Sequence, residues 1–296
     1  MDIRYFDNAA TTRIKEEVLE EMFPYLSLEY GNPSSIYGLG RRAKKAIETA
    51  RTRVANLLNC KPSEITFTSC GSESDNMALK GMAMLQKSKQ TGKNHIITSK
   101  IEHPAILNSC HTLEKLGFKI TYLDVDKEGF VNLDTLINSI TDKTFLISVM
   151  YANNETGVIY PVEEIGDYIK SHSPETRFFV DAVQAGGKLP INVKDTNIDL
   201  LGISGHKFHA PKGVGALYVK PDVRLTPLIN GGHQERGLRA GTENVPYIVA
   251  LGKAAELAQE ALKYELTEVK RLRDRLEEGI LKNVFNARLN TSIKNR

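Results

Sequence analysis

The 296-residue sequence contains no tryptophan and only three cysteines, and no apolar run approaches the ~20 residues of a membrane span. An odd number of widely spaced cysteines, Cys60, Cys70 and Cys110, favours neither a disulfide framework nor a zinc site. The N-terminal stretch MDIRYFDNAATT lacks the apolar core of a secretory signal peptide. From these absences we expect a cytoplasmic protein that does not bind membranes.

The sequence also lacks a strong excess of either charge, since 39 Lys and Arg against 36 Asp and Glu give a net charge of +3. A dedicated nucleic-acid-binding protein would concentrate basic residues in a stripe. The basic residues of the stretch 41–45 lie on a predicted helix whose other face is apolar, so we expect them to form a solvent-exposed face. The length suits one large domain, or one domain plus a smaller piece.

Short β-rich runs alternate with helical patterns along the chain. The predicted strands are 65–68, 95–98, 119–123, 145–149, 177–180, 198–203 and 215–219, and the helical patterns between them include 105–116, 133–140 and 162–171. This alternation predicts an α/β fold with a mainly parallel sheet covered by helices. A short Pro-Lys-Gly link joins the last two strands, which favours an antiparallel last strand.

From Tyr247 onward the apolar residues keep helical spacing as far as Ile280. The strict alternation of three and four residues lapses between Ala258 and Leu266, which favours a long helix bridging two lobes over a coiled coil.

Polar residues follow the carboxyl ends of five of the predicted strands, where ligands bind in open α/β sheets. Each has an ordinary explanation, such as a helix cap, an Asx turn or a surface lysine. Together they supply a small polar loop that opens a helix, an imidazole, an amide, a carboxylate with an adjacent amide, and an amine. The residues are Ser69–Ser74, His103, Asn154, Asp181 with Gln184, and Ser204–Lys207.

This set of groups suits pyridoxal 5'-phosphate. An amine can form a Schiff base with the cofactor, a carboxylate keeps its pyridine nitrogen protonated, and amides at a helix start hold its phosphate. A metal site at His206 and His209 is disfavoured because no cysteine or carboxylate lies nearby in the sequence. No Walker A loop is present, and the Gly38-Leu39-Gly40 stretch does not follow a strand.

Eight motifs carry a specific resemblance to a known family: DNAATT (7–12), YGNPSS (30–35), FTSCGSESDN (67–76), EHPAIL (102–107), ANNETG (152–157), VDAVQAGGKLP (180–190), SGHKFHAPKGVGALYV (204–219) and GGHQERGLRAGTENV (231–245). From residue 5 to about residue 283, the chain resembles a NifS/IscS-type cysteine desulfurase. These proteins belong to the class V aminotransferase branch of the fold-type I pyridoxal-phosphate enzymes.

The resemblance implies roles for individual residues. The residues matching Lys207 and His103 are expected to be catalytic: the first holds the cofactor and acts as the base, and the second stacks on the ring. The other matched cofactor contacts are Asp181 and Gln184 on the ring, Asn154 near the ring oxygen, Gly71, Ser72, Ser204 and His206 on the phosphate, and Thr242 on the phosphate of a neighbouring subunit.

The resemblance further implies that L-cysteine is converted to L-alanine, leaving an enzyme persulfide that supplies iron–sulfur cluster assembly. The expected partners are a second copy of the chain and an iron–sulfur scaffold or another sulfur acceptor. The expected organisation is an N-terminal arm belonging to the small lobe (1–15), a large cofactor-binding domain (16–255), and a bridging helix with an incomplete C-terminal small domain (256–296).

Two departures from the family pattern stand out. Cys70 occupies a position where many relatives have glycine, and we expect it to pack as a small buried hydrophobe. The family's nucleophilic cysteine and its substrate-binding arginine lie in a C-terminal lobe that this sequence does not reach. None of the three cysteines matches the nucleophile, so we expect impaired turnover. A sibling lyase or aminotransferase, such as a selenocysteine lyase, and a non-catalytic cofactor-binding partner remain alternatives.

Overall fold

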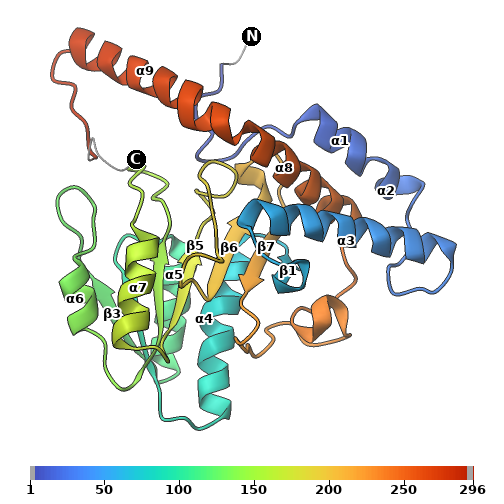
Figure 1. Ribbon diagram of the computed structural model, residues 1–296, viewed down its shortest axis with the longest axis horizontal. Coiled ribbons are helices and arrows are strands. Elements are labelled where there is room, and N and C mark those ends of the chain that lie inside the picture. Colours follow the sequence, from blue (N-terminus) through green and yellow to red (C-terminus); the bar gives the residue numbers. More distant parts are fainter. Residues whose placement is uncertain (1–3, 292–295) are drawn as a thin grey trace.

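The computed structural model describes residues 4–291 and 296, and a seven-stranded sheet lies at its centre (Figure 1). The strand order is β1-β7-β6-β5-β4-β2-β3, with β1 (Ile65–Thr68), β2 (His95–Ser99), β3 (Lys119–Leu123), β4 (Thr144–Met150), β5 (Arg177–Asp181), β6 (Leu200–Ser204) and β7 (Gly215–Val219). The neighbouring strands from β3 to β6 pair in parallel, whereas β7 pairs antiparallel with both β6 and β1. The predicted α/β fold, its strands and the antiparallel last strand are confirmed.

Both faces of the sheet are covered, which explains why its central strands are rich in Val, Ile and Phe rather than alternating with polar residues. All seven residues of β4 are buried. Successive residues point to opposite faces, so Ile147 and Phe178 enter one hydrophobic cluster while Leu146 and Phe179 enter the other.

The helices divide between these two clusters. One face of the sheet packs against α4 (Gly71–Ser88) and α5 (Pro104–Lys115). The other packs against α1 (Glu16–Met22), α3 (Gly38–Leu58), α6 (Leu133–Asn138), α7 (Val162–His172) and α8 (Val245–Tyr264). A four-residue helix, α2 (Pro24–Ser27), follows α1, and short 3-10 turns span Pro62–Glu64 (η1), Gly205–Lys207 (η2) and Gln234–Gly237 (η3).

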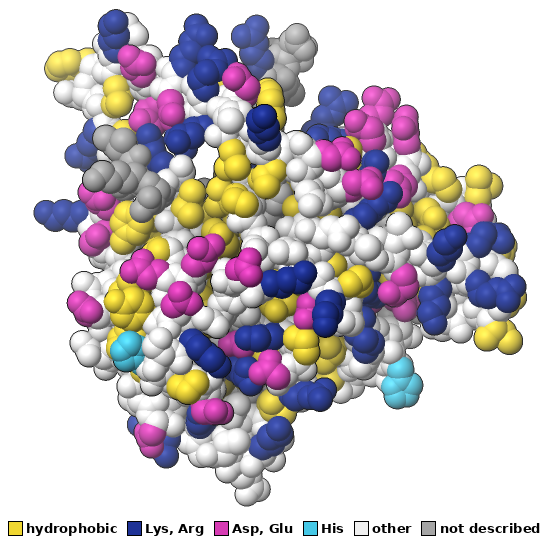
Figure 2. Space-filling model, in the orientation of Figure 1, with side chains coloured by type: hydrophobic (Ala, Val, Ile, Leu, Met, Phe, Trp, Pro, Cys, Tyr) yellow, Lys and Arg dark blue, Asp and Glu magenta, His cyan; other side chains and the backbone are white. Residues whose placement is uncertain are grey.

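The basic residues of α3 lie on its solvent face, as predicted. Arg41, Arg42, Lys44 and Lys45 are exposed, while Ala43 faces the core. Figure 2 shows basic side chains gathered at the end of the molecule where Figure 1 places the start of α3. Acidic side chains gather where Figure 1 places α1, and both signs occur over the rest of this face.

The predicted long helix is also confirmed. Helix α8 continues through a π-helical segment, η4 (Glu265–Val269), into α9 (Lys270–Asn283) (Figure 1). A π-helical segment shifts the positions that face the core, and this one begins at the end of the stretch in which the apolar spacing loses its regularity. The buried residues of α8 end at Ala258, and α9 has none. None of the helices in the described ranges has the length and apolar character needed to cross a bilayer.

A buried ion pair ties the stretch around η3 to α3 and β1. The Arg51 guanidinium donates to both carboxylate oxygens of Glu235, each at 2.7 Å, and the two side chains are 4% and 3% exposed. Glu235 also accepts from the Phe67 amide at 2.9 Å. Glu235 and Arg236 both have positive φ, of 45° and 57°, so the surrounding contacts must hold this backbone in a conformation that L-residues rarely adopt.

Removing one partner of this pair should leave a buried charge without compensation. We expect Glu235→Gln to lower the free energy of unfolding by about 3–5 kcal/mol in urea denaturation. The apolar double variant Arg51→Met with Glu235→Leu should recover much of that loss. The control is Glu29→Gln, which breaks a more exposed pair with Arg42 and should cost at most about 1 kcal/mol. Equal effects of the two Gln variants would contradict the prediction.

Candidate functional site

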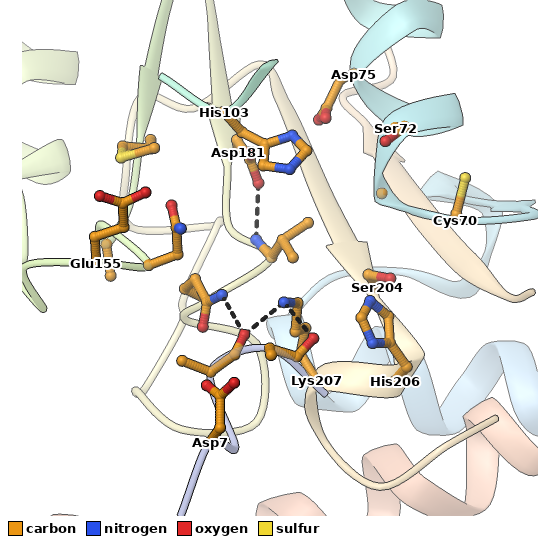
Figure 3. A pocket seen from close by; sticks show the side chains of 18 residues that line it. Asp7, Cys70, Ser72, Asp75, His103, Glu155, Asp181, Ser204, His206 and Lys207 are labelled. Atoms are coloured by element: carbon orange, nitrogen blue, oxygen red, sulfur yellow. Dashed lines mark hydrogen bonds between the residues drawn. The ribbon is translucent and has the colours of Figure 1, made fainter. Parts of the chain in front are cut away.

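The loops at the carboxyl ends of the parallel strands surround a cavity of about 450 Å³, together with Asp7, Ala9 and Ala10 of the N-terminal arm (Figure 3). The structure brings together almost all of the predicted site residues. The cavity is lined by Gly71, Ser72, His103, Asn154, Asp181, Gln184, Ser204, His206 and Lys207. Thr242 does not line it and is exposed on the segment that follows η3.

Lys207 lies in the short turn η2, which begins directly after β6. Its Nζ donates to the main-chain carbonyls of Ala9 at 2.5 Å and Ala10 at 2.9 Å. Burial lowers the pKa of the Lys207 amine, and the carboxylates of Asp181 and Asp7 oppose that shift. The amine is therefore held in place and loses its proton more easily than a surface lysine.

Asp181 ends β5 and is 5% exposed. Its Oδ1 accepts a hydrogen bond from the Val183 amide at 2.9 Å. Burial raises the pKa of this carboxyl, whereas the Val183 amide, His103 and Lys207 favour its ionised form. The next residue after Val183, Gln184, reaches the N-terminal arm, where its Nε2 donates to the Ala9 carbonyl at 3.0 Å.

Two histidines are oriented by their own hydrogen bonds. His103 is the N-cap of α5, and its Nδ1 accepts from the Ala105 amide at 3.1 Å, which places the proton of the neutral ring on Nε2. His206 Nδ1 lies 3.1 Å from Thr11 Oγ1, and its carbonyl accepts from the Thr12 amide at 2.9 Å. The second histidine therefore helps to fix the N-terminal arm over the cavity.

The start of α4 lies on the same wall of the cavity as Ser204 and His206. The first amides of an α-helix have no intrahelical acceptor, and Gly71 and Ser72 present this end to the cavity. A Cβ on Gly71 would lie 2.6 Å from Val183 Cγ2, so a larger residue would displace that neighbour.

Cys70 corrects an expectation from the sequence. It is partly exposed and lines the cavity, so the prediction that it packs as a buried hydrophobe is wrong. The reason is its position as the N-cap of α4, where the helix start faces the cavity rather than the core. Cys60 and Cys110 are buried, and burial raises the pKa of each thiol to about 12.

The structure adds residues that were not predicted as part of the site. Asp7, Ala9 and Ala10 line the cavity from the N-terminal arm, and Asp75 lines it from α4. Asp7 lies within the DNAATT motif and Asp75 within FTSCGSESDN. The two motifs indicated that these stretches belong to the site, but they did not assign a role to either residue. Ala9 and Ala10 act through their main-chain carbonyls, for which side-chain chemistry gives no signal.

Glu102 is a further buried acid beside His103. It is 4% exposed, and its Oε1 accepts from Ser99 Oγ at 2.7 Å and the Met150 amide at 3.0 Å. Its Oε2 has no hydrogen-bond partner among the described residues. Burial, with a smaller contribution from Asp181, raises the pKa of this carboxyl to about 8. At neutral pH Glu102 is therefore largely an uncharged acid.

Comparison with known proteins gives consistent results. A family model described as "Aminotransferase class-V" matches residues 4–295. Cysteine desulfurase 2 of Trichormus variabilis is 53% identical over 290 residues, covering 98% of this chain and 71% of the relative. A solved NifS-like protein has a TM-score of 0.94 at 44% identity and covers 98% of this chain and 78% of its own. SspA, solved in complex with cysteine, has a TM-score of 0.82 at 44% identity, covering 86% and 72%.

The raised pKa of Glu102 predicts how stability changes with pH. Between about 4.5 and 8, the unfolded chain releases this proton while the folded protein keeps it. The stabilisation is therefore complete below about 4.5 and is lost as the pH rises to about 8, by up to ~1.4 kcal/mol per pH unit. We expect Glu102→Gln to remove this contribution from the pH dependence of the free energy of unfolding.

Urea denaturation at a series of pH values measures this dependence. The matched control is Glu128→Gln, at an exposed acid, which should keep the wild-type slope. A Glu102→Gln variant with the same slope as the wild type would show that Glu102 does not hold its proton in the folded state.

Proposed function

The chain belongs to the aminotransferase class-V family, and from this premise we propose that it is a pyridoxal-phosphate-dependent cysteine desulfurase. Such an enzyme converts L-cysteine to L-alanine and transfers the sulfur to a cysteine thiol as a persulfide. The observation that best supports this function is the Lys207 amine in one cavity with the buried Asp181 carboxyl and the open start of α4.

The residues of the cavity fit the cofactor. Lys207 supplies the amine that holds it, Asp181 supplies the anion for its ring nitrogen, and His103 supplies a flat ring whose orientation is fixed by the Ala105 amide. Gly71 and Ser72, with Ser204 and His206 beside them, suit its phosphate. When bound, the cofactor supplies an electron sink that stabilises negative charge at the α-carbon of an amino acid.

The protein's own groups then have distinct roles. Because burial lowers its pKa, the Lys207 amine can give up its proton and take one from the substrate's α-carbon. The Ala9 and Ala10 carbonyls accept hydrogen bonds from that amine and hold it at the cavity wall. We assign Gln184 and Asn154 to contacts with the cofactor ring and its oxygen substituent, and His103 to stacking on the ring and to proton transfer.

We propose L-cysteine as the substrate because one relative is named a cysteine desulfurase and another was solved in complex with cysteine. None of the chain's three cysteines is well placed as the sulfur-accepting nucleophile. Cys60 and Cys110 are buried with raised pKa values, and Cys70 lies at the phosphate end of the proposed site. We propose that an enzyme persulfide would supply iron–sulfur assembly through a scaffold or other acceptor protein in the cytoplasm. We also propose that turnover by this chain alone is impaired, because none of its cysteines is placed to form that persulfide.

We also propose the domain division of the family for this chain. Residues 1–15 would form an arm of the small lobe, residues 16–255 the large domain, and residues 256–296 the bridging helix and the start of the small lobe. The burial along α8 supports the second boundary, because its buried residues end at Ala258.

A homodimer is part of this proposal, with Thr242 reaching the phosphate site of the neighbouring subunit. The stretch from Phe23 to Tyr37 exposes several large hydrophobic side chains, including Phe23, Leu26, Leu28, Tyr30, Ile36 and Tyr37. Pro33 and Ser34 share a hollow of the surface with His233 and Arg236, at the base of the segment that carries Thr242. An apolar surface next to this segment is what a subunit interface requires.

Cofactor attachment at Lys207 tests the proposed site. The protein with added pyridoxal phosphate should absorb visible light, and borohydride should bleach that absorption and fix the cofactor to the Lys207 peptide. L-Cysteine should change the absorption before reduction, because it displaces the lysine. We expect Lys207→Ala to abolish the fixed label, while Lys212→Ala and Cys70→Ala keep it.

Three results would contradict the proposal. The first is a label on Lys212, and the second is a cofactor spectrum that L-cysteine leaves unchanged. Sulfur recovered on Cys70 after incubation with labelled cysteine would show that we have misassigned its role.

Sedimentation at micromolar concentration tests the dimer. We expect the protein with cofactor to be dimeric, and Ile36→Glu to weaken the dimer by about tenfold or more because it places a charge in the apolar interface. Leu116→Glu, at an exposed hydrophobic residue on the C-cap of α5, is the matched control and should remain dimeric. A monomeric wild type with cofactor bound would refute the shared site.

A further inference from the structure

Asp75 is a buried acid of the cavity that the proposed function leaves without a role. It lies in the second turn of α4 and is 1% exposed. Figure 3 shows its carboxyl directed toward the side of the cavity where His103 and Asp181 lie. Its Oδ1 has no hydrogen-bond partner among the described residues. A buried carboxyl oxygen without a donor is costly, and such groups are concentrated at functional sites.

The sheet register places Asp75 next to Asp181. Asp181 of β5 pairs with Gly202 of β6, so the side-chain positions of these two residues share one face of the sheet. A Cβ built on Gly202 would lie 3.4 Å from Asp75 Oδ1. Because Gly202 has no side chain, the Asp75 carboxyl can occupy the space over β6, one strand away from Asp181.

Asp75 and Asp181 have different neighbours, and these neighbours favour different protonation states of the two carboxyls. Burial raises the pKa of Asp75 well above its usual range, and Asp181, Glu102 and Cys70 add to that shift. Asp181 instead accepts from the Val183 amide and faces His103 and Lys207. Two neighbouring buried carboxyls do not both ionise readily, so the negative charge resides on the one with the main-chain donor and the Lys207 amine nearby.

We propose that Asp75 is a positioning residue, an uncharged acid beside the ionised Asp181, so that a single negative charge would be available to a bound cofactor. This inference rests on the proposed function in assigning Asp181 to the ring nitrogen. A neutral Asp75 fills the space beside Asp181 without adding a second charge. Asp181 therefore stays ionised and available to the cofactor.

Infrared spectroscopy of the protein without cofactor tests the protonation directly. With aspartate labelled by ¹³C at its side-chain carboxyl, the wild type at pH 7 should show an isotope-shifted C=O band of a protonated acid. The band should be absent from Asp75→Asn and retained in Asp134→Asn, an exposed control at the start of α6. Wild-type protein with only carboxylate bands would overturn the proposal, even if the Asp75→Asn variant did not fold.

Cofactor binding tests the consequence for the site. The asparagine side chain is uncharged and has nearly the shape of a protonated aspartic acid. Asp75→Asn should therefore bind pyridoxal phosphate with an affinity within about threefold of the wild type. It should also keep the pH at which the visible spectrum of the bound cofactor changes. Asp181→Asn should weaken binding by about tenfold or more, because it removes a charge-assisted hydrogen bond. A large spectral pH shift in Asp75→Asn would show that Asp75 is ionised, and would overturn the proposal.

The two measurements separate this inference from the proposed function. If the wild type binds no pyridoxal phosphate, the proposed function fails, and the infrared band still decides the protonation of Asp75. If the cofactor binds and the band is missing, the function stands and the role of Asp75 is wrong.

Discussion

The parallel pairing of β2, β4, β5 and β6 is the constraint on which the site depends, because it brings the carboxyl ends of all four strands to one edge of the sheet. Met150 pairs with Asp181, and Asp181 pairs with Gly202, so three successive loops begin at nearly the same level. The antiparallel β7 returns the chain toward β1, whose end leads into α4 and its open amides. The groups that follow the strands are thereby placed by backbone pairing rather than by contacts among the groups themselves.

The N-terminal arm is the one wall of the cavity that the sheet does not position. It is attached instead through polar contacts with the turn that follows β6. The Ala9 and Ala10 carbonyls accept from Lys207, and Thr12 donates from both its amide and its hydroxyl to the His206 carbonyl. In the proposed function Lys207 would leave these carbonyls to act on a substrate, so the same contacts that orient the amine would connect its movement to the arm. The Asp7 carboxylate of the same arm favours the protonated amine and so opposes the lowering of the Lys207 pKa by burial.

The sequence predicted what depends on local pattern and missed what depends on distant contacts. Strands such as β4 were predicted because residues buried on both faces form a continuous apolar run. Most site residues were predicted because polar residues directly follow those runs. Asp75 was missed since it lies inside a helix, and its place beside Asp181 depends on Gly202, far away in the sequence. Cys70 was misjudged because its exposure depends on which way the start of α4 faces, and the role of Thr242 stays a prediction that involves a second chain.

Three buried carboxyls, Asp75, Glu102 and Asp181, surround a site that needs only one anion. Burying a neutral acid costs far less free energy than burying an unpaired ion, so an uncharged Asp75 and Glu102 limit the loss of stability. Asp181 is the carboxyl that combines a main-chain donor with nearby His103 and Lys207. Those partners are present because β5 and β6 end side by side. The distribution of protons among the three acids therefore follows from the register of the sheet, since the strand pairing decides which carboxyl meets the cation.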